Sequence, residues 1–408
     1  MSVNTNKAGT LQGVALILPI VLSVMGAVLL APIVPQLMEQ FKDIPNANYW
    51  VPSLLSVPAL CIALFSAPAG YIADKFGRRR ILIWSMFIYA FCGMAPLVLN
   101  DFVAIYISRI GVGLCEAVIM VASTTLIGDY FQNDQRDKWL GSQAATASFS
   151  AMCLFPIAGA LGTFGWRGPF ALYSVSLILV IGVIFFTWEV KGPKTKSEFK
   201  AQDVQSSNRA FPMAHMIKVC LISLVGAVMF YILQFNLGSA LRAEFAVNSS
   251  LMTGIMLSIA SLGVPIGAVF YRYAHKKFTL PKLIMLEFGL LAIGFICMSQ
   301  APNYQLFLAA GFLNQFGAGM VLPTMLTWAM RDLDLHNRGR GTGMWQATFA
   351  FGQFASTLSF AFVVTMTGSA IASFAVFGVV ALVMCIGTAI TLVLARNAQS
   401  SAAPHSVK

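Results

Sequence analysis

Twelve long apolar segments, separated by short polar turns, follow one another through the 408 residues of this chain. A transmembrane helix needs about 20 largely apolar residues, and each segment is long enough to supply one. Charged residues make up only 10% of the chain, against about 25% in typical soluble proteins. The sequence therefore predicts an all-α membrane protein with twelve transmembrane helices. The predicted spans are residues 11–35, 48–73, 80–99, 102–130, 139–162, 168–189, 214–237, 251–273, 281–299, 304–330, 342–366 and 369–395.

Basic residues are distributed unevenly between the two sides of the predicted membrane. If the N-terminus is cytoplasmic, the 26 Lys and Arg all fall on the cytoplasmic side except Lys42, Arg109, Arg167 and Arg242. This asymmetry follows the positive-inside rule and predicts that both termini are cytoplasmic. It also accounts for the net charge of +11 without a nucleic-acid partner. The first apolar run is too long for a signal-peptide core, so we expect it to remain as a spanning helix.

The residue types that carry catalysis or bind metals lack suitable positions in this sequence. All seven cysteines fall inside predicted spans, without the spacing of a metal site. The four histidines lie in or beside predicted cytoplasmic loops or the tail, which offers no buried metal or nucleophilic site. No ATP-binding loop of the G-x-x-x-x-G-K-S/T type is present. We therefore expect that the protein is not an enzyme and that it uses no cofactor or metal. We also expect that its transport is not driven by ATP.

A polar insertion at 191–213, rich in Lys, Ser and Gln, separates six predicted helices from six more. We interpret it as a cytoplasmic linker. The segment 267–277 follows a helix as the segment 70–80 does, at an offset of 197 residues (267 − 70). The sequence thus predicts two pseudo-symmetric halves. The predicted divisions are an N-terminal six-helix bundle (1–190), the linker (191–213), a C-terminal six-helix bundle (214–396) and a cytoplasmic tail (397–408).

The segment 70–80 reads G-Y-I-A-D-K-F-G-R-R-R and lies between two long apolar runs. It closely resembles the loop between the second and third helices of major facilitator superfamily transporters. The resemblance implies two six-helix halves that face a central substrate site. In that family the acid of this loop pairs with the basic side chain and with the start of helix 11, which locks the cytoplasmic side in the outward-open state. The gate residues implied here are Gly70, Asp74, Gly77, Arg78 and Asp129.

Further segments resemble the drug/proton antiporters of this superfamily. Residues 109–117, R-I-G-V-G-L-C-E-A, are similar to the R-x-x-x-G-x-G-x-A segment of helix 4, with Cys115 in place of the second glycine. The Pro32-Ile33-Val34-Pro35 end of helix 1 and the segment 165–170 before helix 6 are also similar. Helix 5 keeps only Pro156 and one glycine of the antiporter pattern G-P-x-x-G-G. The direction of transport therefore stays open.

Charged side chains inside the predicted spans are few, and each costs on the order of 2.5 to 3.5 kcal/mol even on a lenient insertion scale. Arg109 and Glu116 are seven residues apart (116 − 109), which is about 10.5 Å of rise on one helical face. We expect this face to line the central cavity, with Glu116 as the proton-coupling acid and Arg109 as its modulating neighbour. The alternative is an ion pair that only holds helix 4 in place. Glu287 is a weaker candidate because it lies near the cytoplasmic end of helix 9, where an acid can reach water.

Uncharged polar residues in the second half are the remaining candidates for substrate contact. The spacing of Gln346, Phe349 and Gln353 places them on one helical face. Aromatic neighbours such as Trp345 suit an amphipathic organic molecule. The alternative role for the amides is hydrogen bonding between helices. The predicted cavity residues are Tyr231, Gln234, Asn236, Asn314, Gln315, Gln346, Phe349 and Gln353.

Small residues and prolines mark places where helices pack closely or bend. Gly263-x-x-x-Gly267 on helix 8 has the spacing that lets two helix backbones approach. Pro156 and Pro265 lie inside predicted spans, where they interrupt helical hydrogen bonding. We expect a close helix contact at the glycines and bends at the prolines.

Together these features predict a proton-coupled secondary active transporter that works by alternating access. Its expected partners are protons, a small organic substrate and the lipid bilayer, and we expect a monomer in a bacterial-type inner membrane. Export of hydrophobic or amphipathic organic compounds is the favoured function. The alternative is a proton symporter that imports an organic anion, with Arg109 as the anion contact, or another small metabolite. Two further alternatives are less favoured. An uncoupled facilitator would not need Glu116, which this chain has. A receptor that no longer transports would have lost the gate residues Asp74 and Arg78, which are present.

Overall fold

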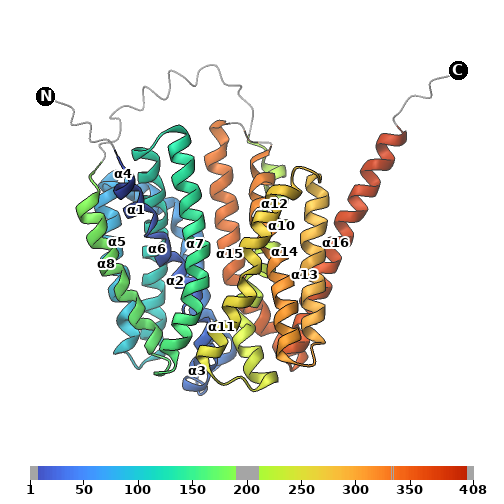
Figure 1. Ribbon diagram of the computed structural model, residues 1–408, viewed down its shortest axis with the longest axis horizontal. Coiled ribbons are helices and arrows are strands. Elements are labelled where there is room, and N and C mark those ends of the chain that lie inside the picture. Colours follow the sequence, from blue (N-terminus) through green and yellow to red (C-terminus); the bar gives the residue numbers. More distant parts are fainter. Residues whose placement is uncertain (1–7, 190–210, 332, 334, 402–408) are drawn as a thin grey trace.

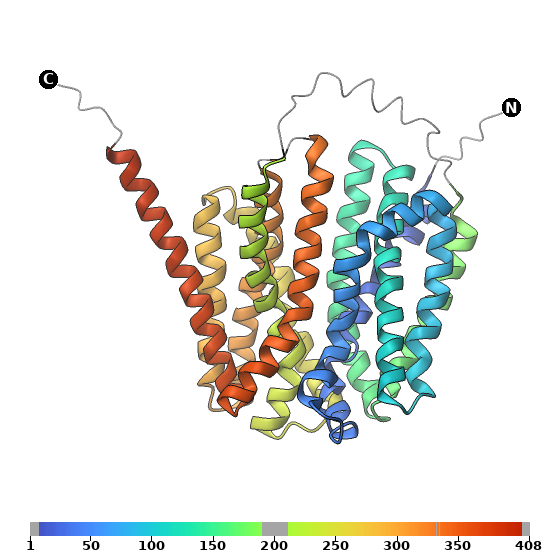
Figure 2. The same cartoon turned by 180° about the vertical axis from the view of Figure 1, so that it is seen from behind.

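The computed structural model describes residues 8–189, 211–331, 333 and 335–401. Within these ranges all regular elements are helices, and twelve spans are long and apolar enough to cross a membrane. The predictions of an all-α fold and of twelve spanning helices are therefore confirmed. Figures 1 and 2 show the helices arranged as two bundles side by side. The predicted linker at 191–213 and the predicted tail at 397–408 lie largely outside the described residues.

The first span is broken into short helices because Pro19 and Pro32 have no N–H for the helical ladder. The second, fourth and fifth spans are long continuous α-helices, whereas a short 3-10 helix ends the third span and another begins the sixth. The N-terminal half consists of α1 (Thr10–Ile17), α2 (Ile20–Val28), η1 (Ala31–Ile33), α3 (Val34–Gln40), α4 (Ala47–Phe76), α5 (Arg78–Met94), η2 (Ala95–Leu97), α6 (Phe102–Tyr130), α7 (Asn133–Gly162), η3 (Gly168–Ser174) and α8 (Val175–Phe186).

The C-terminal half has one comparable break, at Leu262, between the two helices of the eighth span. Pro265 explains it, since proline cannot donate to the carbonyl four residues earlier. The eighth span is thus interrupted near Pro265, whereas Pro156 lies inside the unbroken α7, and bends at the two prolines stay predictions. This half consists of α10 (Met213–Phe245), α11 (Ser250–Ser261), α12 (Gly263–Ala274), α13 (Leu280–Ser299), α14 (Tyr304–Arg331), α15 (Leu335–Thr367) and α16 (Ala370–Ser401).

The glycines of α12 bring its backbone against α14. A Cβ atom at Gly263 would lie 2.5 Å from the carbonyl oxygen of Phe312, and one at Gly267 would overlap the carbonyl oxygen of Phe316. The predicted close packing is thus confirmed. It joins two helices of the same half, so it stiffens that half and forms no part of the interface between the halves.

The two ends of the bundle differ in how the halves meet. We call the end with the α4–α5 turn and the start of α10 the linker end, and the end with α3 and the α10–α11 turn the opposite end (Figure 1). The side-chain contacts between the halves lie toward the opposite end. In the described part of the chain these hydrogen bonds and ion pairs are Glu39–Arg242, Tyr49–Thr365, Ser56–Thr357, Gly159–Ser250 and Met152–Ser258.

Burial along α4 shows the same asymmetry. Its buried residues are concentrated between Ala47 and Cys61, near the opposite end, and beyond that point only Ala69 and Ala73 are buried. In Figure 2 the blue α4 and the orange α15 converge toward the opposite end and diverge toward the linker end. The halves are therefore joined at the opposite end and separate toward the linker end.

Candidate functional site

Arg109 lies on α6 inside the N-terminal half, and its side chain is completely buried. Its guanidinium donates to the carbonyl oxygens of Leu54 (3.3 Å) and Gly26 (3.1 Å) and to the hydroxyl of Tyr173. The Tyr173 ring centroid lies 5.2 Å from the guanidinium carbon, which adds a cation–π contact. Arg109 thus ties α6 to α4, α2 and η3.

Glu116 lies two turns further along α6 and is only 1% exposed. Its carboxylate packs so closely on α2 that a Cβ atom at Gly26 would overlap Oε1. Oε1 has no hydrogen-bond partner, and among the described residues no ion pair joins Glu116 to Arg109. The prediction that this face lines the central cavity is wrong for this conformation, because helices of the N-terminal half cover both side chains. The predicted alternative, a direct ion pair, is absent as well.

Glu287 on α13 is a buried acid in the C-terminal half. Its side chain is 0% exposed, and neither carboxylate oxygen has a hydrogen-bond partner. We predicted that this acid reaches water from the end of its helix, and that prediction is wrong. The covering helix is α14, which approaches so closely that a Cβ atom at Gly317 would lie 3.1 Å from the Glu287 carbonyl oxygen.

Three of the predicted cavity amides form a network inside the C-terminal half. Gln234 donates to Oε1 of Gln315 at 3.1 Å, and Gln315 donates to Oδ1 of Asn314 at 3.3 Å. Asn314 in turn donates to the carbonyl oxygen of Leu291 at 3.2 Å. Asn314 and Gln315 are 0% exposed. For these two residues the cavity prediction is wrong in this conformation, and the alternative of interhelical hydrogen bonds applies, because α10, α13 and α14 meet around them.

The aromatic residues of α10 and α15 form a separate cluster. The Tyr231 ring lies 5.9 Å from that of Phe349 and 5.3 Å from that of Phe235, and Trp345 lies 5.5 Å from Phe349. Nε1 of the buried Trp345 has no hydrogen-bond partner. Along the same helix Gln346 is exposed, whereas Phe349 and Gln353 are buried. We call Tyr231, Trp345, Gln346, Phe349 and Gln353 the aromatic face.

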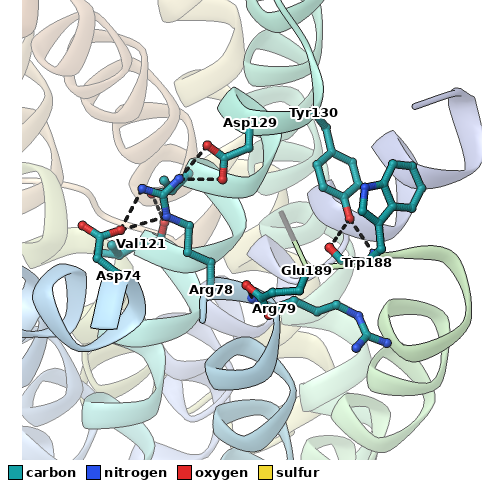
Figure 3. A network of polar contacts seen from close by, with 9 residues as sticks. Asp74, Arg78, Arg79, Val121, Asp129, Tyr130, Trp188 and Glu189 are labelled. Carbon is teal, nitrogen blue, oxygen red and sulfur yellow. Dashed lines mark hydrogen bonds and ion pairs between the residues drawn. The ribbon is translucent and has the colours of Figure 1, made fainter. Parts of the chain in front are cut away.

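The charged residues of the predicted gate come together at the linker end (Figure 3). Arg78 donates from Nε to Oδ1 of Asp74 at 2.9 Å, and from Nη1 to both carboxylate oxygens of Asp129 at 2.6 and 2.5 Å. The Asp74 side chain is 61% exposed, and its contacts with Arg78 both use Oδ1. In the described part of the chain Asp74 does not contact α15, because the halves are apart at this end.

The two predicted gate glycines differ in what the structure requires of them. Gly77 joins α4 to α5 with φ +98° and ψ 122°, a conformation that side-chain-bearing residues rarely adopt. A Cβ atom there would also lie 3.0 Å from the carboxyl carbon of Glu189. At Gly70 the nearest atom, Cγ1 of Val121, would lie at an ordinary 3.6 Å. The turn therefore requires Gly77, while packing in this conformation does not require Gly70.

Sequence reasoning missed Glu189, which follows the sixth span. Its carboxylate accepts from the backbone N–H groups of Arg79 (3.3 Å) and Arg80 (3.1 Å) and so caps the start of α5 (Figure 3). Next to it, the Tyr130 and Trp188 rings stack with centroids 4.6 Å apart. These contacts hold the segment that follows α8 against the α4–α5 turn and the start of α5. No spacing in the sequence connects position 189 with positions 79 and 80, so only the fold reveals the contact.

Comparison with known families identifies the chain's relatives. The family model of the Major Facilitator Superfamily matches residues 16–237 and 219–408, which together cover nearly the whole chain. The chain belongs to the major facilitator superfamily. The resemblance inferred from the gate loop is therefore confirmed. Membership makes the protein an integral, multi-pass membrane transporter with small-molecule substrates. The members of this family are secondary transporters.

Relatives within the superfamily carry different names. The chain is 26% identical to the uncharacterized transporter YceJ of Bacillus subtilis over 73% of this chain and 75% of that protein. It is 23% identical to a probable nitrate transporter, NarT, of Staphylococcus epidermidis over 93% and 96%. It is 24% identical to the class B tetracycline resistance protein of Escherichia coli over 79% and 81%. A tetracycline resistance protein and a probable nitrate transporter thus both occur among these relatives, each at low identity.

Solved major facilitator structures show the same fold. A bacterial homolog of the human lysosomal transporter Spinster, in an inward-facing and unoccupied conformation, matches with a TM-score of 0.75 at 15% identity, over 93% of this chain and 95% of that chain. A D-xylose–proton symporter matches with a TM-score of 0.74 at 16% identity, over 91% and 96%. These likenesses support the arrangement of two six-helix halves.

Proposed function

We propose that this chain is a proton-coupled transporter that exports amphipathic organic compounds, with the linker end facing the cytoplasm. The observation that carries proton coupling is the burial of Glu116, 1% exposed and with Oε1 unpartnered. An unpaired carboxylate in a low-dielectric interior is very costly, and the carboxyl group avoids the cost by binding a proton. Within the ranges that the structure describes, no ion pair or hydrogen bond joins Arg109 to this carboxylate, and the guanidinium is bonded to three other acceptors.

Release of the proton then requires a change around Glu116. The carboxylate packs directly against Gly26 of α2, so a displacement of the first span relative to α6 uncovers it. Coupling follows if substrate and proton favour different positions of these helices, since a ligand shifts an equilibrium only by its differential affinity.

The gate cluster acts in the other half of the cycle. When the halves close at the linker end, Asp74 meets the start of α15, while Arg78 stays fixed between Asp74 and Asp129. The 61% exposure of the Asp74 side chain leaves it free for that contact. A carboxylate at a helix N-terminus is favoured by the helix dipole, which stabilises the closed linker end.

The aromatic face is the proposed substrate surface. Tyr231, Phe349 and Trp345 supply apolar and π surface, and Gln346 and Gln353 lie beside them with amide groups. Such a lining suits an amphipathic molecule with a few polar groups. The tetracycline resistance relative supports this substrate class.

Import by proton symport is the second candidate, favoured by the probable nitrate transporter that matches over 93% of this chain. An anion bound in the membrane needs a positive or hydrogen-bond-donating partner. Arg109, the predicted anion contact, is 0% exposed and has three acceptors within its own half. The burial of Arg109 therefore argues against its role as an anion contact in this conformation.

The deciding experiment measures substrate movement in proteoliposomes under an imposed pH gradient, with a panel of lipophilic cations and organic anions. Wild type is compared with Glu116→Gln and with Glu244→Gln, a control acid that is exposed. We expect movement opposite to protons, lost in Glu116→Gln and kept in the control. Movement together with protons would support symport, and equal transport by Glu116→Gln would reject this coupling residue.

A further inference from the structure

A cavity of about 550 Å³ lies between the two halves at the opposite end. Pro35 and Pro52 of the N-terminal half form one side, and residues of α10 and α15 form the other. Its rim is exposed at Asn48, and its floor is buried, with Asn236 5% and Phe360 5% exposed. This volume lies within the range of about 300 to 1,000 Å³ that is usual for small-molecule sites.

The lining combines apolar walls with uncharged polar groups. Pro35, Pro52 and Phe360 are apolar. Among the described residues Arg242 alone brings a charge to the lining, and Glu39 neutralises it at 2.6 Å. At the floor, Asn236 donates its amide to the carbonyl oxygen of Ile232 at 2.8 Å, which turns that N–H group away from a ligand. Its Oδ1 accepts no hydrogen bond from a described side chain or backbone group, so the floor offers an acceptor.

We propose that this cavity is a second ligand site, which takes a neutral amphipathic organic molecule whose hydrogen-bond donor meets Asn236. Neutrality follows from the paired charge of Arg242 and Glu39, and the apolar body from the proline and phenylalanine walls. Phe360 lies eleven residues after Phe349 (360 − 349), which is about 16 Å along α15. The cavity therefore extends further toward the opposite end than the aromatic face, and its lining begins at Thr357, one helical turn after Gln353.

The position of the cavity also determines what an occupant does. Both halves supply its walls, so parting the halves at the opposite end divides the site. A ligand that binds only the joined state stabilises that state by its differential affinity. The occupant is thus an inhibitor that holds the transporter open at the linker end.

The first test uses the full chain in lipid nanodiscs and four-carbon phenyl probes that differ only in the head group. These are 4-phenylbutanamide, 4-phenylbutyrate and 4-phenylbutylammonium, and the readout is the thermal unfolding temperature, which binding to the folded state raises. We expect the amide to raise it saturably and more than either ion. Ala361→Phe, which fills the cavity from its lining, should abolish the shift. Val379→Phe, at a 55% exposed position on α16, should keep it.

Two results of this test would overturn the proposal. An equal amide shift in Ala361→Phe places the binding elsewhere, for example at the aromatic face. A stronger shift with 4-phenylbutyrate than with the amide rejects a neutral ligand. Both readouts measure binding to the folded protein, so they do not depend on the transported substrate or on the direction of transport.

The second test changes the chemistry of the floor. Asn236→Asp replaces the amide by a carboxylate, and a hydrogen bond to a charged group is stronger than one to a neutral group. The ratio of 4-phenylbutylammonium to 4-phenylbutanamide affinity should rise by about tenfold or more. An unchanged ratio would show that the head group does not meet residue 236. If this variant does not fold, the Ala361→Phe comparison still decides the site.

The effect on conformation is tested by distances between spin labels. Lys138→Cys on α7 and Gly343→Cys on α15 are exposed positions of different halves near the linker end, and Cys297→Ser removes the exposed native cysteine. Saturating 4-phenylbutanamide should increase the population with the longer distance. No change, or a shift to the shorter distance, would contradict a ligand that holds the opposite end closed.

Discussion

Arg242 on α10 and Glu39 on α3 form an ion pair of 2.6 Å that joins the two halves at the opposite end. The residues are 203 positions apart in the chain. Their side chains are 35% and 67% exposed, so the pair contributes only about 0.2 to 1 kcal/mol. That amount is still enough to change the ratio of two conformations by up to about fivefold.

Arg242→Gln should therefore lower the population that is joined at the opposite end. The same spin labels at residues 138 and 343 should report more of the shorter distance, by up to about fivefold in the ratio. The charge-reversed pair Glu39→Arg with Arg242→Glu should restore most of the original ratio. Lys42→Gln, at an exposed position near the same end, is the matched control. An identical response of Arg242→Gln and Lys42→Gln would argue against a role of the ion pair.

Asp74→Asn should slow transport and shift accessibility toward the state open at the linker end. Removing the carboxylate charge costs little stabilisation in the present state, where the side chain is 61% exposed. It costs more in the proposed closed state, where the carboxylate lies beside the start of α15. Cysteine labelling of the linker-end surface measures the shift, and Lys75→Gln, also exposed, is the control. Unchanged labelling would reject gating by Asp74.

Gly77→Ala should destabilise the protein, because φ +98° with ψ 122° is strained for any residue with a Cβ atom. The expected loss is on the order of 1 to 3 kcal/mol, seen as a lower thermal unfolding temperature. Gly182→Ala is the matched control, since it lies in the middle of α8 with no atom within 4 Å of its Cβ position. This control should be neutral or slightly stabilising. Equal temperatures for the two variants would show that the turn tolerates a side chain.

Ser56→Cys with Thr357→Cys should form a disulfide that locks the opposite end. The two hydroxyl oxygens are 2.6 Å apart across the halves, so the side chains at these positions already point toward one another, as the two sulfurs of a disulfide must. Oxidation should stop transport, and reduction should restore it, because the halves can no longer part at this end. Each single cysteine variant serves as a control. Full transport by the cross-linked protein would mean that this interface does not open during the cycle.

Glu287→Gln should leave proton-driven transport largely intact, whereas Glu116→Gln should abolish it. Both acids are buried without hydrogen-bond partners for their Oε1 atoms, so neutral glutamine should be tolerated structurally at either position. The comparison uses the same proteoliposomes and pH gradient for both variants. Loss of coupling in Glu287→Gln alone would move the coupling role to α13.

The gate loop shows how far local sequence patterns reach. Asp74 lies in the last turn of α4 and Arg78 begins α5, on either side of the Gly77 turn. Their contact was predicted from the resemblance of the segment 70–80 to the family's loop, and the structure contains it. Glu189 could not be predicted, because its contact with the N–H groups of Arg79 and Arg80 depends on where the sixth span ends in space.

Predictions about the membrane interior were less successful. Helical spacing correctly placed Arg109 and Glu116 on α6, but it does not tell which neighbouring helix covers that face. Here α2, α4 and η3 supply the partners of Arg109, so the pair lies inside one half. Gln315 and Asn314 were misplaced for the same reason, since their hydrogen bonds join α10, α13 and α14.

The sequence by itself determined that the chain spans a membrane twelve times as helices, because an apolar segment in lipid must satisfy its backbone hydrogen bonds within itself. It also determined the family, through a loop that comprises the end of one helix, the turn at Gly77 and the start of the next helix. Only the tertiary structure decided which acids are buried by neighbouring helices and which amides hydrogen-bond to one another. It also decided at which end of the bundle the two halves are in contact. Those outcomes depend on contacts such as Glu39–Arg242 and Ser56–Thr357, between helices that no local spacing relates.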